Sequence, residues 1–340
     1  MKFNFFSLLL CVLFGLFLVL FLKKEYFQKS ILDQDYEFYI HETMSFEAVT
    51  FKIDSLSQDL SFFSKFFFIP FLNQKRLDYW YRPGRYVLKE SSSVNDIVDK
   101  LRSRSQDPIN FTFNSMDDVS NILSIADNRL ELDSVQLINY LDSINFSLDS
   151  LYFLLIPNTY EIFWDVSPQE FLDRIYFEYN LFWNQSRLNA AHAINLSKKE
   201  VFVLASIVDK EASHVDEMSR IAGLYLNRIT KNWFLAADPT IIYAYKSMFN
   251  ESIRRVRNKH IDKTKSSLFN TYHRKGLPPM PICVPSFQSI DAVLYPEKHE
   301  YMYMCARPDA SEYHNFAKTY FQHKKNASSF HKWLNSRKIF

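Results

Sequence analysis

An uncharged apolar segment near the amino terminus constrains this chain more than any other feature. Residues 5–22 read FFSLLLCVLFGLFLVLFL, with one Ser and no charged residue. About 17–25 apolar residues suffice for a helix to cross a lipid bilayer, so we predict a transmembrane anchor over residues 1–22. KKEYFQKS follows directly, without a small-residue cleavage site. A retained anchor is therefore favoured over a cleavable signal peptide.

The composition of the remaining chain predicts a folded protein and excludes one class of partner. With 340 residues, of which 47% are hydrophobic, the chain can bury one large core or two smaller ones. With a net charge of +2, the chain lacks the excess of Lys and Arg that is typical of nucleic-acid-binding proteins. Beyond Cys11, only Cys283 and Cys305 carry thiols, and no CxxC or HExxH spacing occurs. We expect no metal or disulfide framework, and buried free thiols are favoured over a pair.

Local patterns predict an α+β fold in two parts after the anchor. Alternation in EFYIH and a turn followed by RPGRYVLKE predict strands, while Ser93 with Asp96 predicts a capped helix. The aromatic run FFSKFFFIPF predicts a buried helix or a membrane-proximal patch. These elements form a small α+β module over 23–108. Helical periodicity dominates 109–340, where capping residues at Ser167 and Ser197 begin two helices.

The helix that begins after Ser197 carries an acid on its apolar face. At about 100° per residue, Glu211 shares a face with Leu204, Ile207 and Val208. Burial would penalise the charged form of this carboxyl, raise its pKa and make it a proton donor. A structural alternative is a buried Glu211 bonded to Arg220 or Arg228.

The neighbouring acids have simpler explanations. Ser206, Asp209 and Lys210 share the other edge of the helix, which we expect to face solvent. Ser213 and Asp216 form a capping signal, so a structural role is favoured for Asp216 and for Glu217.

Five motifs in order resemble the YceG-like endolytic murein transglycosylases. They are LASIVDKEA from Leu204, AGLYLNRI from Ala222, DPTIIYA from Asp238, FNTYHRKGLPPMPICVPS from Phe269 and HNFAKT from His314. RPGRYVL and IPNTYEIFW are similar to upstream segments of that family. The resemblance extends from about Tyr36 to nearly the end of the chain.

The resemblance implies a single-pass inner-membrane enzyme with a periplasmic body, a LysM-like module and a mainly helical lytic-transglycosylase-like catalytic domain. Such an enzyme cuts peptidoglycan strands internally and needs no cofactor. The flanking lysines alone would leave the large domain in the cytosol, but long domains are translocated despite such charges. The identity of any peptidoglycan synthase partner stays open.

The resemblance also implies roles for individual residues. The catalytic Glu falls on Glu211, which would protonate the glycosidic oxygen between N-acetylmuramic acid and N-acetylglucosamine. It would then accept the proton of the muramic 6-hydroxyl as a 1,6-anhydro ring closes. Asp209 fits a supporting acid. Candidate substrate-binding residues, each with a structural alternative, are Glu217, Asn227, Asp238, Thr240, Asn270, Thr271 and Tyr272.

Some features depart from the family or leave the function open. Met280 stands where Gly is usual, Leu268 where Pro is usual, and Arg307–Glu312 replace a Gly-rich turn. The loop GLPPMP from Gly276 predicts either a groove wall or a passive connector. Two alternative functions remain: a non-catalytic peptidoglycan-binding protein, or a hydrolase with Glu217 or Asp238 as second carboxylate.

Aromatic and glycine positions give two further expectations. Tyr160, Trp164, Tyr179 and Trp183 could stack on sugar rings, although a core position is favoured. The four glycines of the chain include three outside the apolar segment, Gly84, Gly223 and Gly276. We expect these three to have positive φ or close packing.

Overall fold

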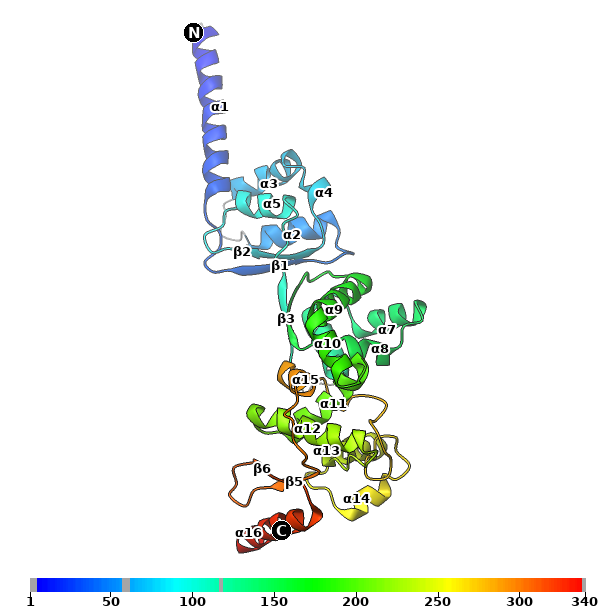
Figure 1. Cartoon of the computed structure of the whole chain (residues 1–340). Coiled ribbons are helices and arrows are strands. Elements are labelled where there is room, and N and C mark those ends of the chain that lie inside the picture. Colours follow the sequence, from blue (N-terminus) through cyan, green and yellow to red (C-terminus); the bar gives the residue numbers. More distant parts are fainter. Residues whose placement is uncertain (1–4, 57–61, 116–118, 338–340) are drawn as a thin grey trace. The chain divides into compact units, whose positions relative to one another are not determined.

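The computed structural model describes residues 5–56, 62–115 and 119–337, and the chain divides into two compact units. The first unit consists of Met1–Phe111, Asp127–Asp133 and Tyr160–Ser167. The second consists of Thr112–Ala126, Ser134–Thr159 and Pro168–Phe340. Helices predominate along the chain, and the described strands pair into small two-stranded sheets (Figure 1). The predicted mixed α and β fold is therefore confirmed.

The elements of the amino-terminal part are α1 (Phe5–Gln28), β1 (Tyr36–Ile40), α2 (Phe46–Leu56), α3 (Phe62–Gln74), α4 (Leu77–Trp80), β2 (Gly84–Leu88) and α5 (Val94–Arg102). Next come β3 (Ile109–Phe113), α6 (Val119–Arg129), α7 (Ser134–Ser143), α8 (Leu148–Leu154) and β4 (Asn158–Ile162), with β3 paired to β4. The carboxy-terminal part contains α9 (Pro168–Phe182), α10 (Gln185–Ala193), α11 (Lys198–Glu211), α12 (Val215–Thr230), α13 (Asp238–Phe249), α14 (Asn258–Lys263), α15 (Phe287–Leu294), β5 (Tyr303–Ala306), β6 (His314–Ala317) and α16 (Tyr320–Ser336).

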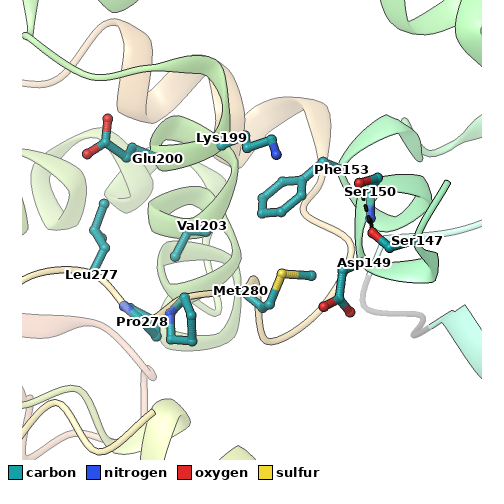
Figure 2. A pocket seen from close by; sticks show the side chains of 11 residues that line it. Ser147, Asp149, Ser150, Phe153, Lys199, Glu200, Val203, Leu277, Pro278 and Met280 are labelled. Carbon is teal, nitrogen blue, oxygen red and sulfur yellow. Dashed lines mark hydrogen bonds between the residues drawn. The ribbon is translucent and has the colours of Figure 1, made fainter. Parts of the chain in front are cut away.

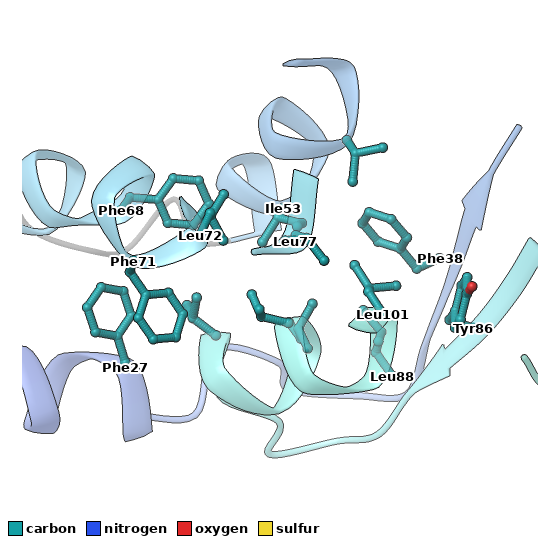
Figure 3. Close-up of a cluster of buried hydrophobic side chains, with 14 of the residues drawn as sticks. Phe27, Phe38, Ile53, Phe68, Phe71, Leu72, Leu77, Tyr86, Leu88 and Leu101 are labelled. Carbon is teal, nitrogen blue, oxygen red and sulfur yellow. The ribbon is translucent and has the colours of Figure 1, made fainter. Parts of the chain in front are cut away.

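The first unit is built on the antiparallel pair β1–β2. Phe38 lies opposite Tyr86, and the inward-facing residues of both strands are fully buried. Helix α5 begins at the predicted capping box of Ser93 and Asp96 and covers the strands with its apolar face. Figure 3 shows Phe27 of α1 against Phe71 of α3, with ring centroids 3.9 Å apart. The helices and the strand pair thus share one hydrophobic core.

The apolar segment forms most of α1, a 24-residue helix. All residues from 9 to 21 are exposed. Within the described ranges, no helix combines the length and hydropathy that a membrane crossing requires. The predicted transmembrane span is therefore not confirmed.

The aromatic run lies in α3, which contains Pro70. Phe68 and Phe71 are buried in the core of the first unit, so the buried-helix interpretation holds for these residues. The sequence from Phe46 to Leu60 has an amphipathic pattern, and its last residues, 57–60, lie outside the described ranges. Tyr160, Trp164, Tyr179 and Trp183 are all buried, as the core interpretation predicts.

Helix α11 is the central element of the second unit. Every residue from Val201 to Asp209 is buried, because α12, α13 and α15 pack around this helix. The expected solvent-facing edge is therefore wrong for Ser206 and Asp209, which are 0% and 3% exposed. Only Lys210 of that edge reaches solvent.

The three glycines outside the apolar segment meet the expected constraints. Gly84 has φ +137° and Gly276 has φ +82°. Gly223 lies within α12, where a Cβ atom would stand 2.4 Å from the carbonyl oxygen of Glu297. Positive φ is strained for other residues, and a 2.4 Å contact with backbone requires the chain to move.

Substitution of Gly223 should destabilise the second unit. Gly223→Ala forces α12 away from the backbone at Glu297, and such overpacking costs about 1–3 kcal/mol. Gly276→Val should also destabilise, through backbone strain at φ +82° and not through a clash, since nothing lies within 4 Å. Thermal unfolding measures both effects.

Gly15→Ala provides the matched control, because its Cβ would also meet nothing within 4 Å and its backbone is helical. An equal melting temperature for Gly223→Ala and Gly15→Ala would contradict the close-packing argument.

Candidate active site

Helix α11 fixes the position of the candidate acid. The helix begins at the predicted capping box, in which Ser197 Oγ accepts from the Glu200 amide at 3.3 Å and Glu200 Oε2 accepts from the Ser197 amide at 2.8 Å. Glu211 is the last helical residue, and Leu204 and Ile207 on its face are fully buried. The side chain of Glu211 is thus held at the end of a rigid element.

Glu211 is half-buried, and one oxygen of its carboxyl, Oε2, is buried without a hydrogen-bond partner among the described residues. Burial raises the pKa of Glu211 to about 7, and the charge of Asp238 acts in the same direction. The charges of His314 and Arg228 and the Tyr225 hydroxyl lower that pKa and only partly offset the burial. The carboxyl is therefore largely protonated just below neutral pH and can release its proton near it.

Neither arginine of the structural alternative pairs with Glu211. Arg220 binds Glu297, with Nε 2.9 Å from Oε2. Arg228 donates from Nε to the Met302 carbonyl at 2.9 Å and from a second nitrogen to the Leu235 carbonyl. Both guanidinium groups hold other segments in place.

Tyr225 of α12 is a second buried group without a partner. Its hydroxyl makes no hydrogen bond within the described ranges, and the residue is fully buried. Burial, followed by the charge of Glu211, raises the pKa of Tyr225 well above its ordinary value. An unsatisfied buried polar group costs about 1–3 kcal/mol. Glu211 and Tyr225 are two such groups, and each affects the pKa of the other. They indicate a place where a ligand supplies the missing hydrogen bonds.

Asp238 and Tyr272 form one wall near the acid. Tyr272 donates from its hydroxyl to Asp238 Oδ1 at 2.5 Å. Burial, and then the negative charge of Asp238, raise the pKa of Tyr272, which keeps its proton. Asp238 is thereby engaged by a phenol while its charge acts on Glu211.

Three further predicted residues hold the segment that carries Tyr272. Thr240 and Thr271 are buried, with their hydroxyl oxygens 2.8 Å apart. Asn270 is fully buried, donates to the Ile261 carbonyl at 2.9 Å and accepts from the Tyr272 amide at 3.1 Å. These side chains use their hydrogen-bonding groups within the protein. Their direct contact with substrate remains a prediction.

Asn227 and Glu217 also bind other parts of the chain. Asn227 Nδ2 donates to the carbonyls of His299 at 2.8 Å and Tyr301 at 3.1 Å. Glu217 is 2% exposed, accepts from the His314 amide at 2.9 Å and lies 2.7 Å from His314 Nδ1. Glu217 therefore anchors β6 to α12.

The structure adds His314 and Tyr225 to the residues singled out from the sequence. Burial alone would lower the pKa of His314, but its bond to Glu217 and the charge of Glu211 outweigh this, and the pKa is raised. A positively charged His314 in turn stabilises the anionic form of Glu211. Both residues lie in motifs quoted above, HNFAKT and AGLYLNRI, and this was the only signal for them.

Asp209 connects α11 to the start of α15 through hydrogen bonds. Its Oδ2 accepts from the Ser286 amide at 2.7 Å, and its Oδ1 accepts from the Ser286 hydroxyl at 2.9 Å. Ser286 is the N-cap of α15. Ser206 makes a parallel contact, accepting from the Ile282 amide at 3.0 Å. The segment 282–286 thus covers the edge of α11 that was expected to be wet.

The GLPPMP loop lines a cavity of about 330 Å³ at the other end of α11. Leu277, Pro278 and Met280 face Lys199 and Val203 of the first turns of the helix (Figure 2). Met280 thus lines this cavity at the start of α11, whereas Glu211 is the last residue of that helix.

The turn between β5 and β6 contains no glycine, and two of its residues have positive φ. Ala310 has φ +59° and Glu312 has φ +61°. The Arg307 amide donates to the Tyr313 carbonyl at 2.8 Å, which closes the turn. Residues other than glycine therefore adopt the left-handed conformation immediately before His314, at a cost of about 1–2 kcal/mol each.

The two cysteines of the second unit are free thiols. Cys283 is buried, and neither it nor Cys305 forms a disulfide. Over 5–56, 62–115 and 119–337, no group of three or more His, Cys, Asp or Glu side chains is arranged to hold a metal ion.

Comparison with known proteins gives consistent matches. Residues 38–329 match the YceG-like family. The chain is 31% identical over 130 residues to a Bacillus subtilis protein named endolytic murein transglycosylase, covering 38% of this chain and 34% of that protein. It is 27% identical over 154 residues to a Streptococcus pneumoniae (strain R6) protein of the same name, covering 45% and 27% of the two chains. The chain thus spans about a third or less of these relatives.

A solved structure shares the fold. The crystal structure of a YceG-like protein from Listeria monocytogenes aligns with a TM-score of 0.51 and 21% identity, covering 86% of this chain and 98% of that chain.

Removal of the Asp209 carboxylate should destabilise the protein. Asp209→Ala leaves the amide and hydroxyl of Ser286 without their acceptors, which costs about 1–3 kcal/mol. Thermal unfolding should show a melting temperature several degrees lower. Asp262→Asn, at an exposed carboxylate, should leave it unchanged. Similar melting temperatures for Asp209→Ala and Asp262→Asn would contradict the anchoring role of Asp209.

Proposed function

The chain belongs to the YceG-like family, and we propose on this basis that it is an endolytic peptidoglycan lytic transglycosylase. It cleaves the bond between N-acetylmuramic acid and N-acetylglucosamine within glycan strands and leaves 1,6-anhydro-muramic ends. The observation that carries the proposal is the carboxyl of Glu211, whose Oε2 atom is buried without a hydrogen-bond partner among the described residues and whose pKa is raised to about 7.

Glu211 acts in both halves of the reaction. The neutral carboxyl first gives its proton to the glycosidic oxygen, so that the bond from this oxygen to C1 of muramic acid breaks. The resulting carboxylate then accepts the proton of the muramic 6-hydroxyl while O6 bonds to C1 and closes the anhydro ring. A pKa near neutral suits a group that must first donate a proton and then accept one. The substrate supplies the nucleophile, so one carboxyl suffices.

The surroundings of Glu211 support this use. The charge of Asp238 favours the neutral acid, and the charge of His314 favours the carboxylate that follows proton transfer. The buried Tyr225 hydroxyl is free to donate a hydrogen bond to a sugar oxygen or to the carboxylate.

A hydrolase would need a second carboxylate as base or nucleophile. Asp238 is engaged by Tyr272 at 2.5 Å, and Glu217 is engaged by two groups of His314. This favours the single-acid mechanism. The product distinguishes the functions: anhydro ends for a transglycosylase, reducing ends for a hydrolase, and no cleavage for a binding protein.

We assign the first unit as a LysM-like module behind a membrane anchor. An antiparallel β1–β2 pair with helices between the strands supports the LysM-like assignment of residues 23–108. Exposed apolar side chains over residues 9–21 support association of α1 with lipid. In this proposal the module and the catalytic unit lie on the periplasmic side of the inner membrane.

Glu211→Gln should abolish cleavage while preserving the fold. The substitution keeps the volume and removes the titrating group, so turnover of purified peptidoglycan should fall by at least ~10²–10⁴-fold. For the wild-type protein, kcat/KM should fall as pH rises through about 7, because only the protonated form starts the reaction. Mass analysis of the released muropeptides measures both.

The unfolding temperature of Glu211→Gln serves as the folding control. Because burial raises the pKa of Glu211, ionising it destabilises the folded wild type as pH rises from about 4.5 through about 7. At pH 8 the variant should therefore melt at the same temperature as wild type or higher. A folded variant that still releases anhydro-muropeptides at the wild-type rate would refute the catalytic assignment. A variant that melts lower would favour a structural role.

A reporter fused to the carboxy terminus should show which side of the membrane the body occupies. We expect an alkaline phosphatase fusion, active only outside the cytoplasm, to be active. A green fluorescent protein fusion, which fluoresces after folding in the cytosol, should be dark. The reverse pattern would exclude the periplasmic location.

A further inference from the structure

A cavity beside α13 takes no part in the chemistry proposed above. It has a volume of about 680 Å³, within the range of small-molecule sites. The walls come from α8, α11, α13 and Ile282, all within the second unit. Because Lys210 and Lys246 both line it, we call it the lysine cavity.

The charged residues that line the lysine cavity are all basic. Lys210 and Lys246 line it, and no Asp or Glu does. Neither ammonium group has an ion-pair partner among the residues that the structure describes. The charge of Lys210 acts on the buried Asp209 carboxylate, but both oxygens of that carboxylate are bound to Ser286. The cavity at the start of α11 differs, because Lys199 is accompanied there by Asp149 and Glu200. Two unpaired ammonium groups favour an anionic ligand.

The rest of the lining is apolar and hydrogen-bonding. Ile242 and the ring of Tyr243 form part of one wall, and Tyr243 packs against Phe269 with ring centroids 4.6 Å apart. Ser247 and Asn250 add a hydroxyl and an amide near the end of α13. Apolar contact combined with amide-type hydrogen bonding and positive charge suits a short acidic peptide better than an uncharged sugar.

The lysine cavity adjoins the candidate acid on two elements. Lys210 precedes Glu211 on α11, and Pro239 follows Asp238 on α13. Successive residues on a helix point about 100° apart, so the cavity and Glu211 face different directions from the same helix end. A group bound in the cavity would therefore be distinct from the sugar that reacts at Glu211.

We propose that the lysine cavity binds the carboxylate-bearing peptide branch of a peptidoglycan strand while a sugar of the same strand lies at Glu211. Peptides attached to the lactyl group of muramic acid carry free carboxylates, apolar alanine methyl groups and amide bonds, which match the lining. This inference rests on the proposed function for the identity of the polymer, and on the cavity alone for the class of ligand.

Calorimetric titration of the full-length protein with a soluble muramyl tripeptide tests the cavity without catalysis. The pair Lys210→Met/Lys246→Met keeps the apolar stems and removes both charges, so it should bind about 3- to 20-fold more weakly. The pair Lys210→Arg/Lys246→Arg should bind like wild type, and so should the exposed control Lys265→Met. Equal binding by the Met pair and wild type would overturn the proposal. Equally tight binding of inorganic phosphate would overturn the peptide assignment.

Cleavage of two substrates separates this proposal from the proposed function. Wild type should show a lower KM for peptide-bearing strands than for strands whose peptides an amidase has removed, by a factor similar to the binding loss. The Met pair should lose that difference and keep the wild-type kcat on stripped strands. Equal KM values for wild type would overturn the proposal. If wild type cleaves neither substrate, the proposed function fails, and the titration alone decides the ligand of the cavity.

Discussion

The burial of Val201–Asp209, the middle of α11, on all sides is the constraint on which the second unit depends. A helix in such a position must satisfy its polar side chains internally, because water does not reach them. Ser206 and Asp209 do so by accepting from the backbone of 282–286, and that segment is thereby fixed along the helix. The result places α15 against α11 and leaves Glu211 at the end of an element that cannot rotate.

Buried polar side chains that are hydrogen-bonded within the protein differ in role from those that lack a hydrogen bond. The first kind supports the fold, and the second kind is available for a ligand or a reaction. Asn270, Thr240 and Thr271 are buried and bonded within the protein, which gives them the character of a scaffold. Glu211 and Tyr225 each have a buried oxygen atom without a hydrogen-bond partner in the part of the chain that the structure describes. Proteins rarely tolerate such groups in a core unless they serve a ligand or a reaction. The same reasoning applies to charge, since the raised pKa of Glu211 comes mainly from burial that a structural residue would avoid.

Features that depend on nearby residues could be predicted from the sequence. The start of α11 follows from Ser197 and Glu200, which lie within one turn, and the apolar face of Glu211 follows from helical periodicity. The burial of Asp209 could not be predicted, because it depends on Ser286, 77 residues away. His314 was missed for the same reason: a histidine in a motif becomes informative only when its carboxylate partner, 97 residues earlier, is known. Periodicity gives the faces of a helix, but only tertiary structure tells which faces are covered.

The β5–β6 turn and the Glu217–His314 contact also bear on when the site forms during synthesis. A link across 97 residues closes a long loop, and such non-local contacts form late because their entropic cost must be met by packing already in place. The segment that carries His314 emerges from the ribosome after α11, α12 and α13. A nascent chain can therefore hold the acid in its helix before it has the neighbour that favours the ionised state. In the proposed mechanism, the electrostatic setting of Glu211 is therefore incomplete until the segment that carries His314 has been synthesised and has packed against α12.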